Sequence, residues 1–110
     1  MGIFFWKKNE LIDKVAVVLA DEFYSQVQPR LVINYFQGVK QDNKARKKNQ
    51  GLELMLKKTA DQIISFRKEN SLGIYGKARL HLKFTNRLNE LGYPEDIAQQ
   101  INEILLIRTP

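Results

Sequence analysis

The spacing of apolar residues is the feature of this sequence that most restricts its fold. In residues 52–66, apolar side chains recur three and four residues apart, which places them on one face of a helix. The same period appears in residues 11–23, 80–91 and 97–105. No stretch carries the turn signals of a β-hairpin. The pattern therefore predicts an all-α fold, a compact bundle of about five helices.

Capping residues set the expected ends of these helices. Asn9 is a favourable N-cap, so the first helix is expected over residues 10–27, and a later one over residues 51–69. Gly92 suits the position just after a helix, and Pro94 suits the start of the last one. The expected core faces are Leu11, Ile12, Val15, Val18, Leu19 and Phe23; Leu52, Met55, Leu56, Ala60, Ile63 and Phe66; Leu80, Phe84, Leu88 and Leu91; and Ile97, Ala98, Ile101, Ile104 and Leu105.

Residues 30–37 fit either a short buried helix or a strand. Their β-branched and aromatic side chains, such as Ile33 and Tyr35, also suit a strand. We interpret the stretch as a helix, because no second strand is evident to satisfy its backbone hydrogen bonds. Pro29 is tolerated at the first position of such a helix.

The composition is that of a globular domain with few means of catalysis. A chain of 110 residues can bury one hydrophobic core, so a single domain over residues 1–110 is expected. Cysteine is absent and His81 is the only histidine, which disfavours a transition-metal site and Ser-His-Asp chemistry. No apolar run is long enough to span a bilayer. We expect a cytoplasmic protein that is not an enzyme, with no cofactor and no small-molecule substrate.

Positive charge is concentrated in the middle of the chain. The net charge is +6, but residues 40–87 hold 13 Lys or Arg against 4 Asp or Glu, while the remainder holds 5 against 8. Residues 40–50 have almost no apolar content, so we expect a flexible loop or a solvated helical extension there. Such an asymmetry attracts nucleic acid, anionic lipid or an acidic protein face, without choosing among them.

Gly73 and Gly76 lie close to this positive charge. The order Gly-x-x-Gly followed by Lys77 resembles, locally, the loop with which KH domains approach the nucleic-acid backbone. The three-stranded sheet of that family is not predicted here, so the family is not assigned. We interpret the two glycines as part of a flexible turn between helices.

Beyond the glycines, Arg79, Lys83 and Arg87 recur every four residues and form a basic row along one helix. Such a row suits a phosphate backbone, and it equally suits solvent. Tyr75 and Leu82 lie beside the row and away from the core face, which favours a partner surface, although packing on another helix is the alternative. The candidate interaction surface comprises Lys44, Arg46, Lys47, Lys48, Tyr75, Lys77, Arg79, Leu82, Lys83 and Arg87.

The aromatic start of the chain is a second candidate contact. Phe4, Phe5 and Trp6 precede Lys7 and Lys8, an order typical of a shallow contact with an anionic membrane. The alternative is that these aromatic side chains close one end of the bundle or are buried in a dimer contact. We prefer this alternative, because large side chains cover a small core efficiently.

Three functions are consistent with these features. We favour a non-enzymatic interaction module that presents its basic surface to an acidic protein partner or to a second copy of itself. The second is a nucleic-acid-binding protein that uses the same surface. The third is a peripheral membrane protein held by its aromatic N-terminus. Salt should weaken nucleic-acid binding steeply but leave apolar self-association intact, and membrane binding should fail without residues 3–6.

Overall fold

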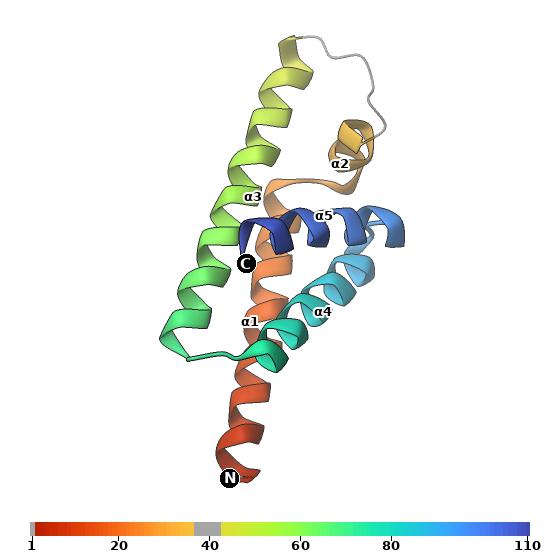
Figure 1. Ribbon diagram of the computed structural model, residues 1–110. Coiled ribbons are helices and arrows are strands. Elements are labelled where there is room, and N and C mark those ends of the chain that lie inside the picture. Colours follow the sequence, from red (N-terminus) through yellow and green to blue (C-terminus); the bar gives the residue numbers. More distant parts are fainter. Residues whose placement is uncertain (1, 37–42) are drawn as a thin grey trace.

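The computed structural model describes residues 2–36 and 43–110, with side chains described in residues 7–36 and 49–110. These residues form α1 (Gly2–Gln26), α2 (Pro29–Phe36), α3 (Asn43–Glu69), α4 (Ile74–Leu91) and α5 (Glu95–Arg108). α1 and α3 run side by side along the long axis, α4 crosses α1 obliquely, and α5 lies across α3 and α4 (Figure 1). The described residues contain no strand. The predicted all-α bundle is therefore confirmed, and so is the helix opened by Pro29.

α1 and α3 both begin earlier than predicted. α1 starts at Gly2, so Asn9 lies inside the helix and is not its N-cap. α3 starts at Asn43, so residues 43–50 form a helical extension rather than a loop. Residues 37–42 lie outside the described residues. Lys, Arg and Gln continue a helix as well as most apolar residues do, so the start of the apolar period does not mark the start of the helix.

The predicted core faces of α3, α4 and α5 are confirmed. Side chains at the predicted positions are buried or pack on the buried cluster as partly exposed neighbours. Short helices are only marginally stable alone in water, so the burial of these apolar faces against one another is what stabilises them. The fully or nearly fully buried members are Leu52, Met55, Leu56, Ala60, Ile63, Leu80, Phe84, Leu88, Ile97, Ala98, Ile101 and Leu105.

α1 buries only part of the predicted face: Ile12, Leu19 and Phe23 are buried as predicted, and Val15 packs on the core. The prediction includes Leu11 and Val18, but these side chains are 41% and 60% exposed. Ala16 and Ala20 are completely buried instead. The distance between packed helices depends on the side chains at the contact, and alanine allows a neighbouring helix to come close. The buried face therefore combines these alanines with large side chains, and Leu11 and Val18 lie outside it.

α1 and α4 run in the same direction with a constant register. Phe23 and Phe84 meet edge to face between them, with ring centroids 6.3 Å apart. The constant register follows from polar contacts that each join residues 66 positions apart in the sequence. They link Asp13 to Arg79, Asp21 to Arg87, and the Tyr93 hydroxyl to the Val27 carbonyl oxygen.

The turn between α3 and α4 spans residues 70–73, so it includes Gly73 but not Gly76, and the predicted turn is confirmed only in part. Ser71 has the positive φ of 50°, whereas Gly73, with φ of −85°, is the N-cap of α4. Gly76 is buried inside α4, where an added Cβ would lie 3.2 Å from Leu72 and 3.5 Å from Ile12. Gly76 is therefore suited to close packing rather than to unusual backbone angles.

Gly92 ends α4 in a left-handed conformation with φ of 118°, as predicted. We expect Gly92→Ala to lower the free energy of unfolding by about 1–2 kcal/mol, because side chains are strained in this conformation. An added Cβ would meet only Pro29, at 4.0 Å, so crowding contributes little.

Gly51→Ala is the matched control for this variant. Gly51 is exposed inside α3, where an added Cβ has no neighbour within 4 Å. This substitution should raise the free energy of unfolding by about 0.5–1 kcal/mol. Urea unfolding measures both changes. A Gly92→Ala chain as stable as the wild type would contradict the role assigned to Gly92.

Candidate functional site

Two of the three cations in the basic row are bound to carboxylates of α1. Arg79 donates hydrogen bonds from Nε and Nη2 to the two carboxylate oxygens of Asp13, at 2.8 and 2.9 Å. Arg87 donates from Nε to Asp21 at 2.8 Å and from Nη1 to Glu90 at 3.0 Å. The row therefore fastens α4 to α1, and it offers less positive charge to a partner than its sequence alone indicates.

These ion pairs persist at neutral pH. The hydrogen bond from Arg79 holds the pKa of Asp13 below its usual value, against the opposing effect of burial. The same interaction raises the pKa of Arg79, and the contact with Asp21 raises that of Arg87. A carboxylate with a lowered pKa and a guanidinium with a raised one both stay charged across the physiological range.

Lys83 lies between these two arginines in the row. No carboxylate of the described residues lies within 4.0 Å of its ammonium group. Its charge acts on Asp13, whose pKa it helps to lower. Because Arg79 and Arg87 are paired, Lys83 is the cation of the row with the most capacity for an acidic group from outside.

Tyr75 and Leu82 lie on the outer face of α4, where they are 55% and 58% exposed. The alternative that they pack on another helix is therefore wrong. The Tyr75 hydroxyl accepts a hydrogen bond from Nη1 of Arg79 at 3.3 Å, which joins the aromatic ring to the basic row. Ala78 is exposed between them. We call Tyr75, Ala78 and Leu82 the α4 stripe.

The other predicted surface residues lie elsewhere. The positive charge of Lys77 helps to lower the pKa of the buried His81. Lys77 therefore lies on the His81 side of α4 and not on the α4 stripe. The remaining cations, Lys44, Arg46, Lys47 and Lys48, belong to the first turns of α3, which extend from the end of the bundle away from the start of α4 (Figure 1). Phe4, Phe5 and Trp6 belong to the first turns of α1 at the opposite end (Figure 1). The side chains of both groups lie outside the described residues.

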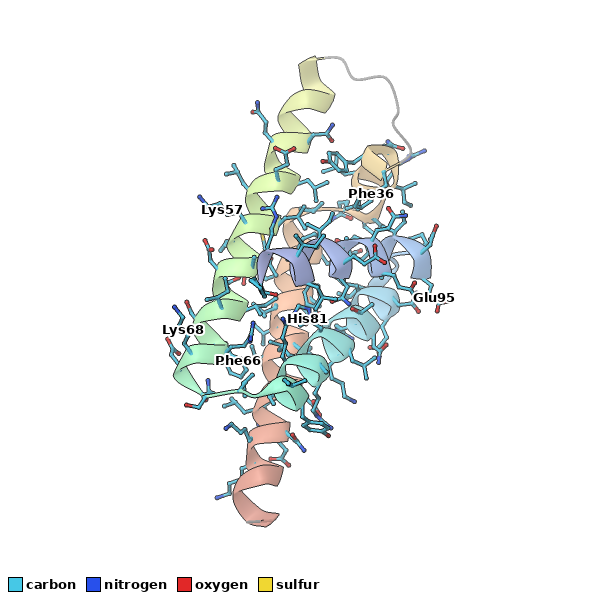
Figure 2. The ribbon with its side chains drawn as sticks, viewed as in Figure 1. Phe36, Lys57, Phe66, Lys68, His81 and Glu95 are labelled. Carbon is cyan, nitrogen blue, oxygen red and sulfur yellow. The ribbon has the colours of Figure 1, made fainter. Side chains whose placement is uncertain are left out.

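A buried polar cluster joins α3, α4 and α5 in the middle of the bundle, where Figure 2 labels His81. His81 Nδ1 lies 2.9 Å from Asn102 Oδ1, and its Nε2 lies 3.4 Å from Thr109 Oγ1. Arg67 donates to the carbonyl oxygens of Thr109 and Pro110, at 2.9 and 3.1 Å. The cluster fastens the end of α5 to the neighbouring helices. No local sequence signal reveals it, because its members are far apart in the chain.

This cluster makes stability depend on pH. Burial lowers the pKa of His81, and the charges of Lys77 and Arg67 act in the same direction, whereas the Asn102 contact opposes them. The unfolded chain binds this proton near pH 6.5, and the folded chain binds it only at lower pH. Between the pKa of His81 in the folded state and pH 6.5, the unfolded chain therefore binds more protons than the folded chain. We expect the free energy of unfolding to fall as the pH drops below 6.5, by at most about 1.4 kcal/mol per pH unit.

Urea unfolding between about pH 7.5 and about pH 5 measures this slope, because the carboxylates titrate below that range. The variant His81→Gln should lose the slope, whatever its overall stability. Titration of the imidazole signals by NMR provides an independent readout. A His81 pKa at or above 6.5, or an unchanged slope in the variant, would contradict the assignment.

Two kinds of site were sought among the described residues, a group of metal ligands and a membrane-spanning helix. Among them, no three His, Asp or Glu side chains are grouped so as to hold a metal ion. No helix within the described ranges is long and apolar enough to cross a bilayer. Comparison of the chain with protein-family models, curated proteins and solved structures finds no match. The function is therefore argued from the chain's own surface.

Proposed function

We propose that the chain is a small helical interaction module that binds an acidic protein partner, or a second copy of itself, through the outer face of α4. The observation that carries the proposal is the exposed α4 stripe beside Lys83. Burying a large apolar side chain contributes roughly 1.5–3 kcal/mol, so Tyr75 and Leu82 provide substantial binding energy to a partner that covers them. A carboxylate of that partner would complete the ion pairing of the row.

The spacing of the α4 stripe supports a helical or extended protein segment as the partner. Its members, at positions 75, 78 and 82, follow the three- and four-residue spacing with which helices present anchoring side chains to one another. Single exposed apolar residues are ordinary on protein surfaces. A continuous row of them beside a cation is more typical of a contact surface.

A nucleic-acid partner is the second candidate, and the excess of Lys and Arg in residues 40–87 favours it. The geometry of α4 weakens it, because Arg79 and Arg87 already bind carboxylates of their own chain. Phosphates at the row would compete with Asp13 and Asp21 for both guanidinium groups. The apolar stripe also provides nothing for a phosphate to bind.

Removal of the internal carboxylates tests the nucleic-acid candidate. Asp13→Asn combined with Asp21→Asn releases both arginines, so we expect oligonucleotide binding to strengthen. Two added phosphate contacts should steepen the slope of log affinity against log salt by about 1.4 for a single strand. Fluorescence anisotropy of a labelled oligonucleotide at low and near-physiological salt provides the measurement.

The matched control is Glu53→Gln combined with Asp61→Asn, which removes the same negative charge from exposed positions on α3. It should strengthen binding less. For the wild type we expect weak binding, with a dissociation constant on the order of 10⁻⁴–10⁻⁶ M, that disappears as salt rises. Wild-type binding that persists at physiological salt, and is lost when Arg79, Lys83 and Arg87 all become Glu, would place the nucleic-acid function first.

Site-specific cross-linking tests the protein-binding function directly. A photoreactive benzophenone amino acid replaces Leu82 in the full chain, in the cells that make it. The control carries the same group at Ser65, which is exposed on α3. We expect discrete protein adducts from position 82 that are absent from position 65 and weakened by Lys83→Glu. Equal adducts from both positions, or adducts that nuclease removes, would contradict the proposal.

A further inference from the structure

The outer face of α5 has the opposite charge to the basic row. Glu103 is exposed there, and Leu106 and Ile107 follow it by three and four residues, which places them one helical turn away. Ile107 is 80% exposed. Within the described residues, no Lys or Arg lies within 4.0 Å of the Glu103 carboxylate. Arg108 is five residues on and lies on a different side of the helix.

The two faces are complementary. α4 presents exposed apolar side chains beside Lys83, a cation without an ion-pair partner among the described residues. α5 presents exposed apolar side chains beside Glu103, an anion without such a partner in the same part of the chain. Both faces are open to solvent, so they do not cover each other within one molecule.

We infer that these faces bind each other between copies of the chain: the α5 face of one copy, formed by Glu103, Leu106 and Ile107, occupies the α4 stripe of the next. This inference rests on the proposed function and identifies the partner. If the two helices are antiparallel and Glu103 meets Lys83, then Ile107 lies level with Arg79, between the positions of Tyr75 and Leu82. Apolar burial then supplies the affinity, and the ion pair sets the register.

A symmetric contact between two α4 faces fits the charges less well. It would bring the basic rows of both copies together, and like charges at an interface are unfavourable. The α4-to-α5 contact instead joins two different patches. When two copies are joined by one such contact, one α4 stripe and one α5 face remain unused, so the assembly continues into a chain or closes into a ring. The expected species are therefore larger than a dimer at high concentration.

Variants that block one face each test this geometry. Leu82→Asp blocks the α4 face and Ile107→Asp blocks the α5 face, and both side chains are exposed, so the fold should remain. Sedimentation velocity up to about 1 mM covers the range of weak association. We expect the wild type to exceed monomer mass as concentration rises, and each variant alone to stay monomeric. An equimolar mixture of the two should form a dimer and nothing larger, because it contains one intact pair of faces.

Two further variants serve as controls. Leu54→Asp changes an exposed apolar residue on α3, so it should associate like the wild type. Lys83→Glu and Glu103→Lys should each weaken association, because each places like charges opposite one another, and the two together in one chain should restore it with the ion pair reversed. If the double variant does not regain association, the assigned ion pair between Lys83 and Glu103 is wrong.

The remaining outcomes separate the inference from the proposed function. Loss of association in Leu82→Asp without loss in Ile107→Asp would indicate a symmetric α4 contact and overturn the inference. A wild type that stays monomeric would also overturn it. If position 82 of that monomer still cross-links to other proteins, the proposed function stands. If it cross-links to none, the function fails as well.

Discussion

The close packing of α4 against α1 is the contact on which the rest of the bundle depends. Gly76 on α4 packs directly against Ile12 of α1, and Phe23 and Phe84 meet further along. Interiors are packed densely, so a larger residue at position 76 would push α4 away from α1. The ion pairs of α4 with α1 would be lost together with the apolar contact.

This packing also decides which charges face outward. The sequence divides into a basic middle and acidic flanks, but the fold places acidic residues of α1 directly against the basic row of α4. Asp13 and Asp21 neutralise two arginines and leave Lys83 beside the α4 stripe. Opposite charges that are far apart in the sequence are thus partly paired in the folded structure. The net charge of a segment therefore overstates its attraction for a polyanion.

Periodicity was sufficient to predict the all-α class, the core faces of three helices and the exposed position of Tyr75 and Leu82. For α1 it predicts Ile12, Leu19 and Phe23 correctly but wrongly includes Leu11 and Val18, because two neighbouring faces of that helix are both apolar. The ion pairs and the His81 cluster escaped prediction for another reason. Their members lie far apart in the sequence, so only the fold brings them together. The predicted helix starts are too late, because aromatic residues extend α1 before Asn9 and basic residues extend α3 before its apolar face.

The constant separation of 66 residues between α1 and α4 has a consequence for synthesis. A ribosome that adds 5–20 residues per second makes the α4 partner of an α1 residue roughly 3–13 s after that residue itself. During this interval the alanine-lined face of α1 lacks the helix that covers it. Closing so long a loop costs entropy, and only the completed α4 repays it. The nascent α1 therefore exposes this part of its apolar face until α4 has been made.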